Sequence, residues 1–364
     1  MTRTFRKLPP GTHWTLKAFE LTAIRVASPV VCFWAPLIMV AVALRDWEMS
    51  MTQVIGVLVV AGAGCQMGAH LALTGVELPE ATKGFKDRLR AAFLWPLSPR
   101  VQTILLMIWA GCYPLGWKTA AIAMGSLAFR CVWDTRVAVW LWKKLGYFRP
   151  AGESIRNLVE RVSTRTGVSC RAVYETESTT ANAYALTWSR EVAITTGAVA
   201  ALSEPEMEAV IAHELGHLNE APSVRWTRLL GLIPSCLMVL VLPVMNSWDF
   251  FRGLLVIITA HIVEQELAKH SRRAEKAADA AAKSDEVLDG IYARALERIG
   301  EANLLPVVMS GKGTHPNLYD RMVAAGVQPD YPRPPAAESG PSWWTAWWLA
   351  VMTGLMFWGL TKDL

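Results

Sequence analysis

The sequence predicts a membrane α-helical bundle joined to an α+β domain that faces water. Three observations predict it: 52% of the 364 residues are hydrophobic, several apolar runs are long enough to cross a bilayer, and a more polar middle part carries a cluster of histidines and carboxylates. A helix needs about 20 apolar residues to span a bilayer. Basic residues beside the apolar runs account for most of the net charge of +5, so this charge does not indicate nucleic-acid binding.

The apolar runs lie before, between and after the polar segments of the chain. The sequence holds 17 tryptophans, a residue that favours the membrane interface. Short connections alternate with longer basic ones, and basic connections mark the cytoplasmic side of a membrane protein. This pattern predicts that the N-terminus and residues 143–228 lie in the cytoplasm. The runs cover residues 26–44, 51–73, 101–117, 119–142, 229–248, 250–263 and 343–360.

The most informative motif is H-E-L-G-H, which begins at His213 and ends at His217. Two histidines four residues apart lie on one face of a helix, so both imidazoles can bind one zinc ion. Glu214 then points towards the same metal, where it can act as the base that takes a proton from the attacking water. A capping box at 203–206 and apolar residues at helical spacing predict the helix itself. A charged helix with solvent-facing histidines is the simpler alternative.

A catalytic zinc site takes three protein ligands and leaves the fourth position for water. The best third ligand is Glu275, one helical turn before Asp279 in an Ala-rich segment. Asp279 would accept the free ring N–H of a ligand histidine and fix its tautomer. Taken alone, this segment would be interpreted as a solvated charged helix. Four other candidates lie nearby without a matching acid one turn later: His261, Glu264, Glu266 and His270.

Four motifs occur in the order found in one known family. The segment Asn182-Ala183-Tyr184-Ala185 precedes the H-E-L-G-H helix, and S-R-R-A-E-K-A-A-D at 271–279 and T-H-P at 314–316 follow it, with Arg321 after them. Over residues 150–325 the chain resembles the membrane zinc metallopeptidases of the gluzincin type, which include the HtpX heat-shock protease and the CAAX prenyl proteases. Lys276 departs from the family pattern, in which an aromatic residue is common at this position.

The resemblance implies a zincin-like (gluzincin) metalloprotease domain of α+β class. It implies one Zn²⁺ per chain, held by His213, His217 and Glu275, with Glu214 as the catalytic base. Asp279 would lie behind a ligand histidine.

The resemblance also assigns roles to residues outside the metal cluster. Asn182, Ala183, Tyr184 and Ala185 would form an edge strand, with which an extended substrate pairs through its backbone. His315 would donate to the oxyanion of the tetrahedral intermediate, and Arg321 would hold that segment. A turn histidine with only a structural role remains the alternative for His315.

These assignments divide the chain into six parts. Within the soluble parts, the pattern predicts helices at 153–165 and 285–299 and strands at 169–175, 182–188 and 191–195. The parts are an N-terminal membrane region with about four apolar helices (1–148), the first part of the protease domain (149–228), a membrane helical hairpin (229–263), the second part of the protease domain (264–330), a Pro-rich linker (331–342) and a C-terminal membrane helix (343–364).

Together, the apolar runs and the resemblance predict a multi-pass, integral-membrane zinc metalloendopeptidase. Its active site would face the cytoplasm from a bacterial inner membrane. The expected partners are the lipid bilayer and a membrane-associated protein or peptide substrate, with membrane proteins or misfolded proteins as the class that is cleaved. Two alternatives remain open, namely a non-catalytic membrane receptor or scaffold that keeps the fold, and a dedicated signalling protease that cleaves one regulator.

Overall fold

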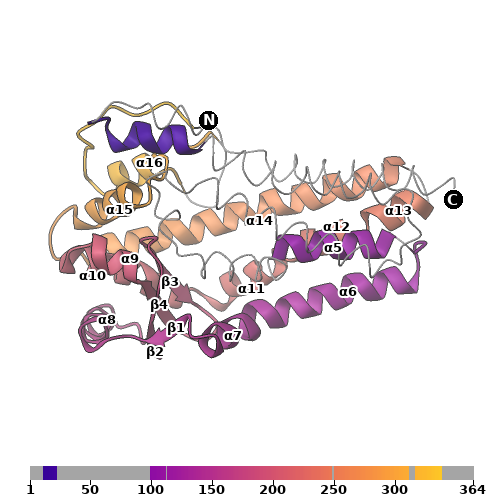
Figure 1. Ribbon diagram of the computed structural model, residues 1–364, viewed down its shortest axis with the longest axis horizontal. Coiled ribbons are helices and arrows are strands. Elements are labelled where there is room, and N and C mark those ends of the chain that lie inside the picture. Colours follow the sequence, from indigo (N-terminus) through magenta and orange to yellow (C-terminus); the bar gives the residue numbers. More distant parts are fainter. Residues whose placement is uncertain (1–10, 23–98, 112, 248–249, 311–315, 338–364) are drawn as a thin grey trace.

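One long helix, α14 (Phe250–Ser284), connects the two halves of the protein (Figure 1). The first half is a bundle of helices, and the second half contains a β-sheet. The structure, a computed structural model, describes residues 11–22, 99–111, 113–247, 250–310 and 316–337. The first part of α14 packs against α12 (Ile233–Val239) and α13 (Val241–Ser247), and α14 also packs against α10 (Glu204–Leu218), the helix with the H-E-L-G-H motif. The predicted runs 26–44, 51–73 and 343–360 lie outside the described residues, as does His315.

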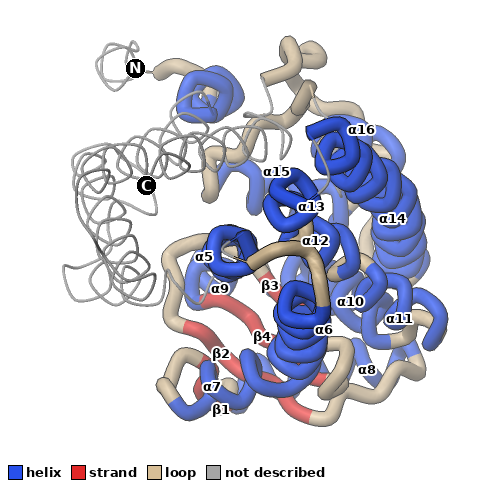
Figure 2. The backbone as a smooth tube through the Cα atoms, turned by 90° about the vertical axis from the view of Figure 1, so that its right-hand side faces the viewer, coloured by secondary structure: helices blue, strands red, loops and turns tan. Residues whose placement is uncertain are grey.

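A four-stranded sheet forms the centre of the second half within the described residues (Figure 2). Its order is β1-β2-β4-β3, in which β2 and β4 are parallel and the outer strands are antiparallel to their neighbours. The strands are β1 (Phe148–Pro150), β2 (Ala172–Thr176), β3 (Ala183–Leu186) and β4 (Glu191–Thr195). The three predicted strands are therefore confirmed, with β2 and β3 shorter than predicted, whereas β1 was not predicted.

Helices around the sheet bury a common apolar core. The alternating strand residues Val192 and Ile194 join Ile211 and Leu215 of α10 in one cluster of fully buried side chains. Burial of each such side chain contributes roughly 1.5–3 kcal/mol, so this cluster fixes α10 relative to the sheet. The surrounding helices are α8 (Glu153–Thr166), α9 (Thr196–Ala201), α15 (Ile291–Ala302) and α16 (Leu318–Ala324).

The helix predicted at 285–299 begins later than expected, because residues 285–290 form a turn. The carboxylate of Asp285 pairs with Arg165 at 2.8 Å instead of facing solvent on a helix. Gly290 has a φ of 77°, a left-handed conformation that only glycine adopts easily, and α15 starts directly after it. The Glu286 side chain accepts hydrogen bonds from the backbone of Gly290 and Tyr292, which satisfies donors at the start of α15.

The apolar runs that the structure describes before and around α14 form a helical bundle with interruptions. The run at 119–142 lies in one continuous helical stretch, whereas the run at 229–248 is broken into short helices. Pro234 and Pro243 lie within this broken stretch, and proline lacks the N–H that a helix interior needs. Besides α12 and α13, the bundle holds α5 (Pro99–Gly111), α6 (Trp117–Val132), the π-helix η4 (Trp133–Val137), α7 (Ala138–Lys144) and α11 (Pro222–Leu230).

One helical stretch of the described residues, Pro222–Met245, is long and apolar enough to cross a membrane by length and composition. Half of its most apolar window is buried inside the protein, and the core helix of a soluble protein passes the same test. The described part of the chain therefore supports membrane insertion at one stretch and leaves the multi-span bundle a prediction.

Candidate active site

The helix α10 has a strong start signal, and it delivers three of the predicted site residues. Ser203 and Glu206 form a capping box, in which the Ser203 backbone donates to the Glu206 carboxylate at 2.8 Å. This satisfies donors that the first turn of a helix leaves open. His213, Glu214 and His217 then follow on the buried side of the helix, each with less than a tenth of its surface exposed.

Gly216 of the motif allows α14 to pass close to α10. A Cβ atom at this position would lie 3.2 Å from the Cα of Ala278, tighter than ordinary van der Waals contact. A larger side chain would therefore push the two helices apart. The close approach brings Glu275, one turn before Ala278 on α14, opposite the two histidines.

The three predicted metal ligands form one buried cluster. Donor atoms of His213, His217 and Glu275 all lie within 4.8 Å of one another. The two Nε2 atoms are 3.2 Å apart, and the carboxylate oxygens of Glu275 lie 3.6 and 3.7 Å from them. Two nitrogens at about 2.05 Å from a tetrahedral zinc would be separated by about 3.3 Å. Two imidazoles and one carboxylate are also a common catalytic zinc set, so the donors fit this metal.

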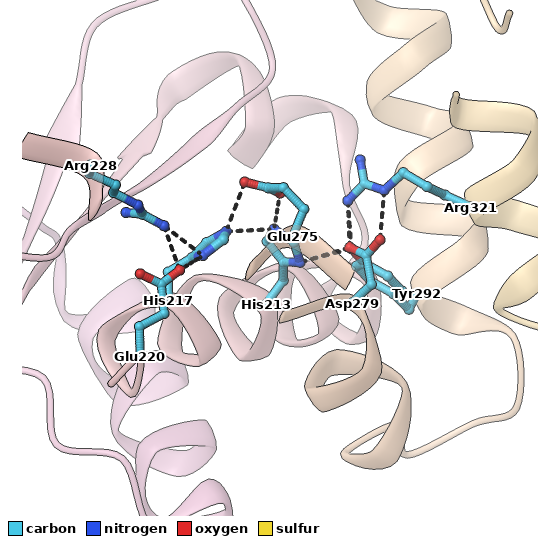
Figure 3. A network of polar contacts seen from close by, with 8 residues as sticks. All are labelled: His213, His217, Glu220, Arg228, Glu275, Asp279, Tyr292 and Arg321. Atoms are coloured by element: carbon cyan, nitrogen blue, oxygen red, sulfur yellow. Dashed lines mark hydrogen bonds and ion pairs between the residues drawn. The ribbon is translucent and has the colours of Figure 1, made fainter. Parts of the chain in front are cut away.

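A group of polar side chains from α14, α15 and α16 contacts the Nδ1 side of His213 (Figure 3). Its Nδ1 atom lies 3.1 Å from the carboxylate of Asp279 and 2.9 Å from the hydroxyl of Tyr292. Arg321 donates to both Asp279 oxygens, at 2.7 and 2.9 Å, and to the Tyr292 hydroxyl at 2.8 Å. Tyr292 in turn donates to Asp279. The Tyr292 hydroxyl can therefore accept a hydrogen bond from the Nδ1–H of His213, which leaves Nε2 of His213 free for a metal.

The electrostatics of this group favour a charged carboxylate. Burial would raise the pKa of Asp279, but hydrogen bonds from His213 and Arg321 outweigh it and hold that pKa well below its usual range. Burial raises the pKa of Tyr292 well above its usual value, so its hydroxyl stays protonated. Asp279 therefore remains an acceptor throughout the neutral range.

His217 has a separate group behind it. Its Nδ1 atom lies 2.7 Å from the carboxylate of Glu220, and Arg228 of α11 donates to the same carboxylate oxygen. Burial would lower the pKa of His217, but hydrogen bonds to Glu220 and Glu275 outweigh it and raise the pKa to about 9. The negative charge of Glu214 adds to this effect.

The predicted substrate strand lies at an edge of the sheet. β3 is the last strand in the order, and α10 packs against it, so its free edge is close to the motif helix. Ala183 is buried in the core, whereas Tyr184 is 42% exposed. Asn182 precedes β3 and its carbonyl accepts from the backbone of Thr195. Ala185 is half-buried. The substrate-binding role predicted for residues 182–185 stays a prediction.

Three residues of the two groups were not found from the sequence. Tyr292 comes from α15, far along the chain from His213, and no local motif marks it. Glu220 lies three residues after His217, which is a helical neighbour spacing and a usable signal. Arg228 lies eight residues further on and gives no signal of its own. Arg321 was predicted to hold the His315 segment, and in the structure its guanidinium binds Asp279.

Comparison with known proteins identifies a family that is similar to the part of the chain that holds this site. Residues 151–326 match peptidase family M48. This part of the chain is similar to members of that family. The matched residues contain strands β2 to β4, the two histidines, Glu275, Arg228 and Arg321, and the resemblance predicted from the four motifs is confirmed.

Two curated relatives of this chain are both named Protease HtpX homolog. The protein from Pelotomaculum thermopropionicum is 25% identical over 171 residues, which cover 44% of this chain and 58% of the relative. The protein from Acidiphilium cryptum is 31% identical over 159 residues, covering 39% of this chain and 54% of the relative. The chain thus spans a little over half the length of the relatives that it matches.

Proposed function

We propose that this protein is an integral-membrane zinc metalloendopeptidase that cleaves membrane or misfolded proteins. One observation carries the proposal: an M48 domain places His213, His217 and Glu275 within 4.8 Å of one another, with Glu214 on the same helix as the histidines. The family match and the names of both relatives support peptidase activity.

The side chains of the site divide the chemistry between them. Zinc bound by His213, His217 and Glu275 would act as a Lewis acid that polarises the scissile carbonyl and acidifies a water molecule. Glu214 takes the proton of the attacking water and passes it to the leaving amine. Asp279 and Glu220 hold the Nδ1 side of the two histidines, which leaves each Nε2 atom free to bind a metal. The free edge of β3 pairs with the extended substrate through backbone hydrogen bonds.

Exposed apolar side chains support the membrane part of the proposal. On α14 they recur along one face, as Phe251, Leu255, Ile258 and Ile262, each between 43% and 74% exposed. Trp117, Met124, Phe129 and Val132 are similarly exposed along α6. Soluble monomers rarely expose contiguous apolar stripes of this kind, and a bilayer would cover them.

The orientation of the protein follows from the basic connections, and we infer that the active site faces the cytoplasm of a bacterial cell. A reporter enzyme fused after Arg149 should report the cytoplasm, and one placed near Asp46 should report the opposite side. If the two reporters gave reversed results, the localisation of the active site would be wrong.

A cleavage assay tests the proposed function. Purified full-length protein in nanodiscs should cleave an unfolded membrane protein, lose this activity after chelation, and regain it with about one zinc per chain. If zinc-loaded protein cleaved no unfolded substrate, a receptor or scaffold would be the better account. If it cleaved a single native regulator and nothing else, it would be a dedicated signalling protease.

A further inference from the structure

Each histidine of the metal cluster is supported by its own carboxylate and arginine (Figure 3). The group behind His213 matches the predicted role of Asp279. We propose that Glu220 and Arg228 form a second positioning pair, which fixes His217 for the metal and makes zinc affinity depend on the placement of α11. This inference rests on the proposed zinc site.

The first step concerns the tautomer of His217. A carboxylate can only accept hydrogen bonds, so the 2.7 Å contact to Glu220 requires a proton on Nδ1 of His217. The lone pair of the neutral ring then lies on Nε2, the atom that faces Nε2 of His213 at 3.2 Å. Glu220 therefore selects the ring form that can bind a metal and also sets the direction of the ring.

The second step concerns the position of Glu220. It lies in the short connection between α10 and α11, and only 7% of its side chain is exposed. A buried carboxylate is costly without a counter-charge. Arg228 supplies that charge: its Nη2 atom donates to Glu220 and lies 3.4 Å from Nδ1 of His217. Removal of Arg228 would leave the buried Glu220 carboxylate without this counter-charge. Glu220 would then be held less firmly beside Nδ1 of His217.

The third step links this pair to the candidate membrane stretch. Arg228 lies in α11, the first part of Pro222–Met245. α11 packs against α14, the helix that carries Glu275. A shift of α11 would withdraw Arg228 from Glu220 and free the His217 ring to rotate. Zinc affinity should therefore depend on the position of α11. The residues that contact Nδ1 of His213 come from other helices and do not create this dependence.

A matched set of variants tests the pair in full-length protein in nanodiscs, with zinc affinity measured by competition with a chromophoric chelator. Glu220→Ala should weaken zinc binding by about 10–100-fold, and Arg228→Ala by about 10-fold, the lower end of that range. Glu220→Gln keeps an acceptor of the same shape and should lose less than alanine. Arg225→Ala removes a like charge from the same helix and should bind zinc as the parent does.

Two further measurements separate positioning from a general loss of structure. The double variant Glu220→Ala/Arg228→Ala should lose no more affinity than Glu220→Ala alone, because the arginine acts through the glutamate. Arg228→Lys keeps the charge and should recover part of the loss. Thermal unfolding of the zinc-free variants provides the fold check, and Glu220→Gln carries the test if Glu220→Ala does not fold.

The outcomes separate this inference from the proposed function. Wild-type protein that binds no zinc would contradict the proposed function itself. Wild-type protein that binds zinc, together with a Glu220→Ala variant of equal affinity, would overturn only the positioning pair. Equal losses in Arg225→Ala and Arg228→Ala would also overturn it, because the effect would then come from the charge of α11 in general.

Discussion

Replacement of Glu214 by glutamine is expected to slow peptide cleavage by about 10²–10⁴-fold while leaving zinc binding and the fold intact. The amide has the shape of the carboxylate but cannot take a proton from the attacking water. Glu214 is buried on α10 and follows His213 directly in the sequence. It contributes no donor atom to the metal cluster. The measurement is kcat/KM on an unfolded substrate, with zinc content determined on the same sample.

Two variants calibrate this result. Glu204→Gln lies on the same helix and removes only an exposed ion pair with Arg161, so its rate should stay close to that of the parent. Asp279→Asn should weaken zinc affinity or rate by about 10–100-fold through His213. If Glu214→Gln cleaves as fast as the parent, the peptidase mechanism is wrong whatever the zinc content.

Glu275→Ala and His213→Ala are each expected to lose most of the bound zinc. The parent should hold about one zinc per chain, and a catalytic site of this kind needs all three protein ligands. Elemental analysis after gel filtration gives the zinc content directly. Lys276→Ala is the matched control, because this side chain is exposed on α14 beside Glu275. Full zinc retention in Glu275→Ala would exclude the third ligand and direct attention to Glu264 or His261.

The metal cluster could be predicted from sequence because its parts follow helical spacing. His213 and His217 are one turn apart, as are Glu275 and Asp279, so each pair occupies one face of its own helix. The capping box at Ser203 predicted the start of α10. The order of the four motifs indicated that the two helices contribute to one site. None of this depends on tertiary contacts.

Tertiary contacts decide what the sequence could not show. Tyr292 reaches His213 only because α15 packs against α10, and Arg228 reaches Glu220 from α11, which packs against α14. α14 also continues through the boundary predicted at 263/264, since a change from apolar to polar side chains alters the surroundings of a helix without ending it. No sequence pattern marks the short strand β1. It is recognised only by its pairing with β2 in the structure.

Anomalous diffraction recorded at the zinc absorption edge from crystals of the zinc-loaded protein tests the central claim most directly. The claim is that one zinc ion lies between His213, His217 and Glu275. The expected result is a single anomalous peak at about 2.0–2.2 Å from both Nε2 atoms and from a carboxylate oxygen of Glu275. A peak at another place in the protein, or a zinc at this place without Glu275 among its ligands, would contradict the account.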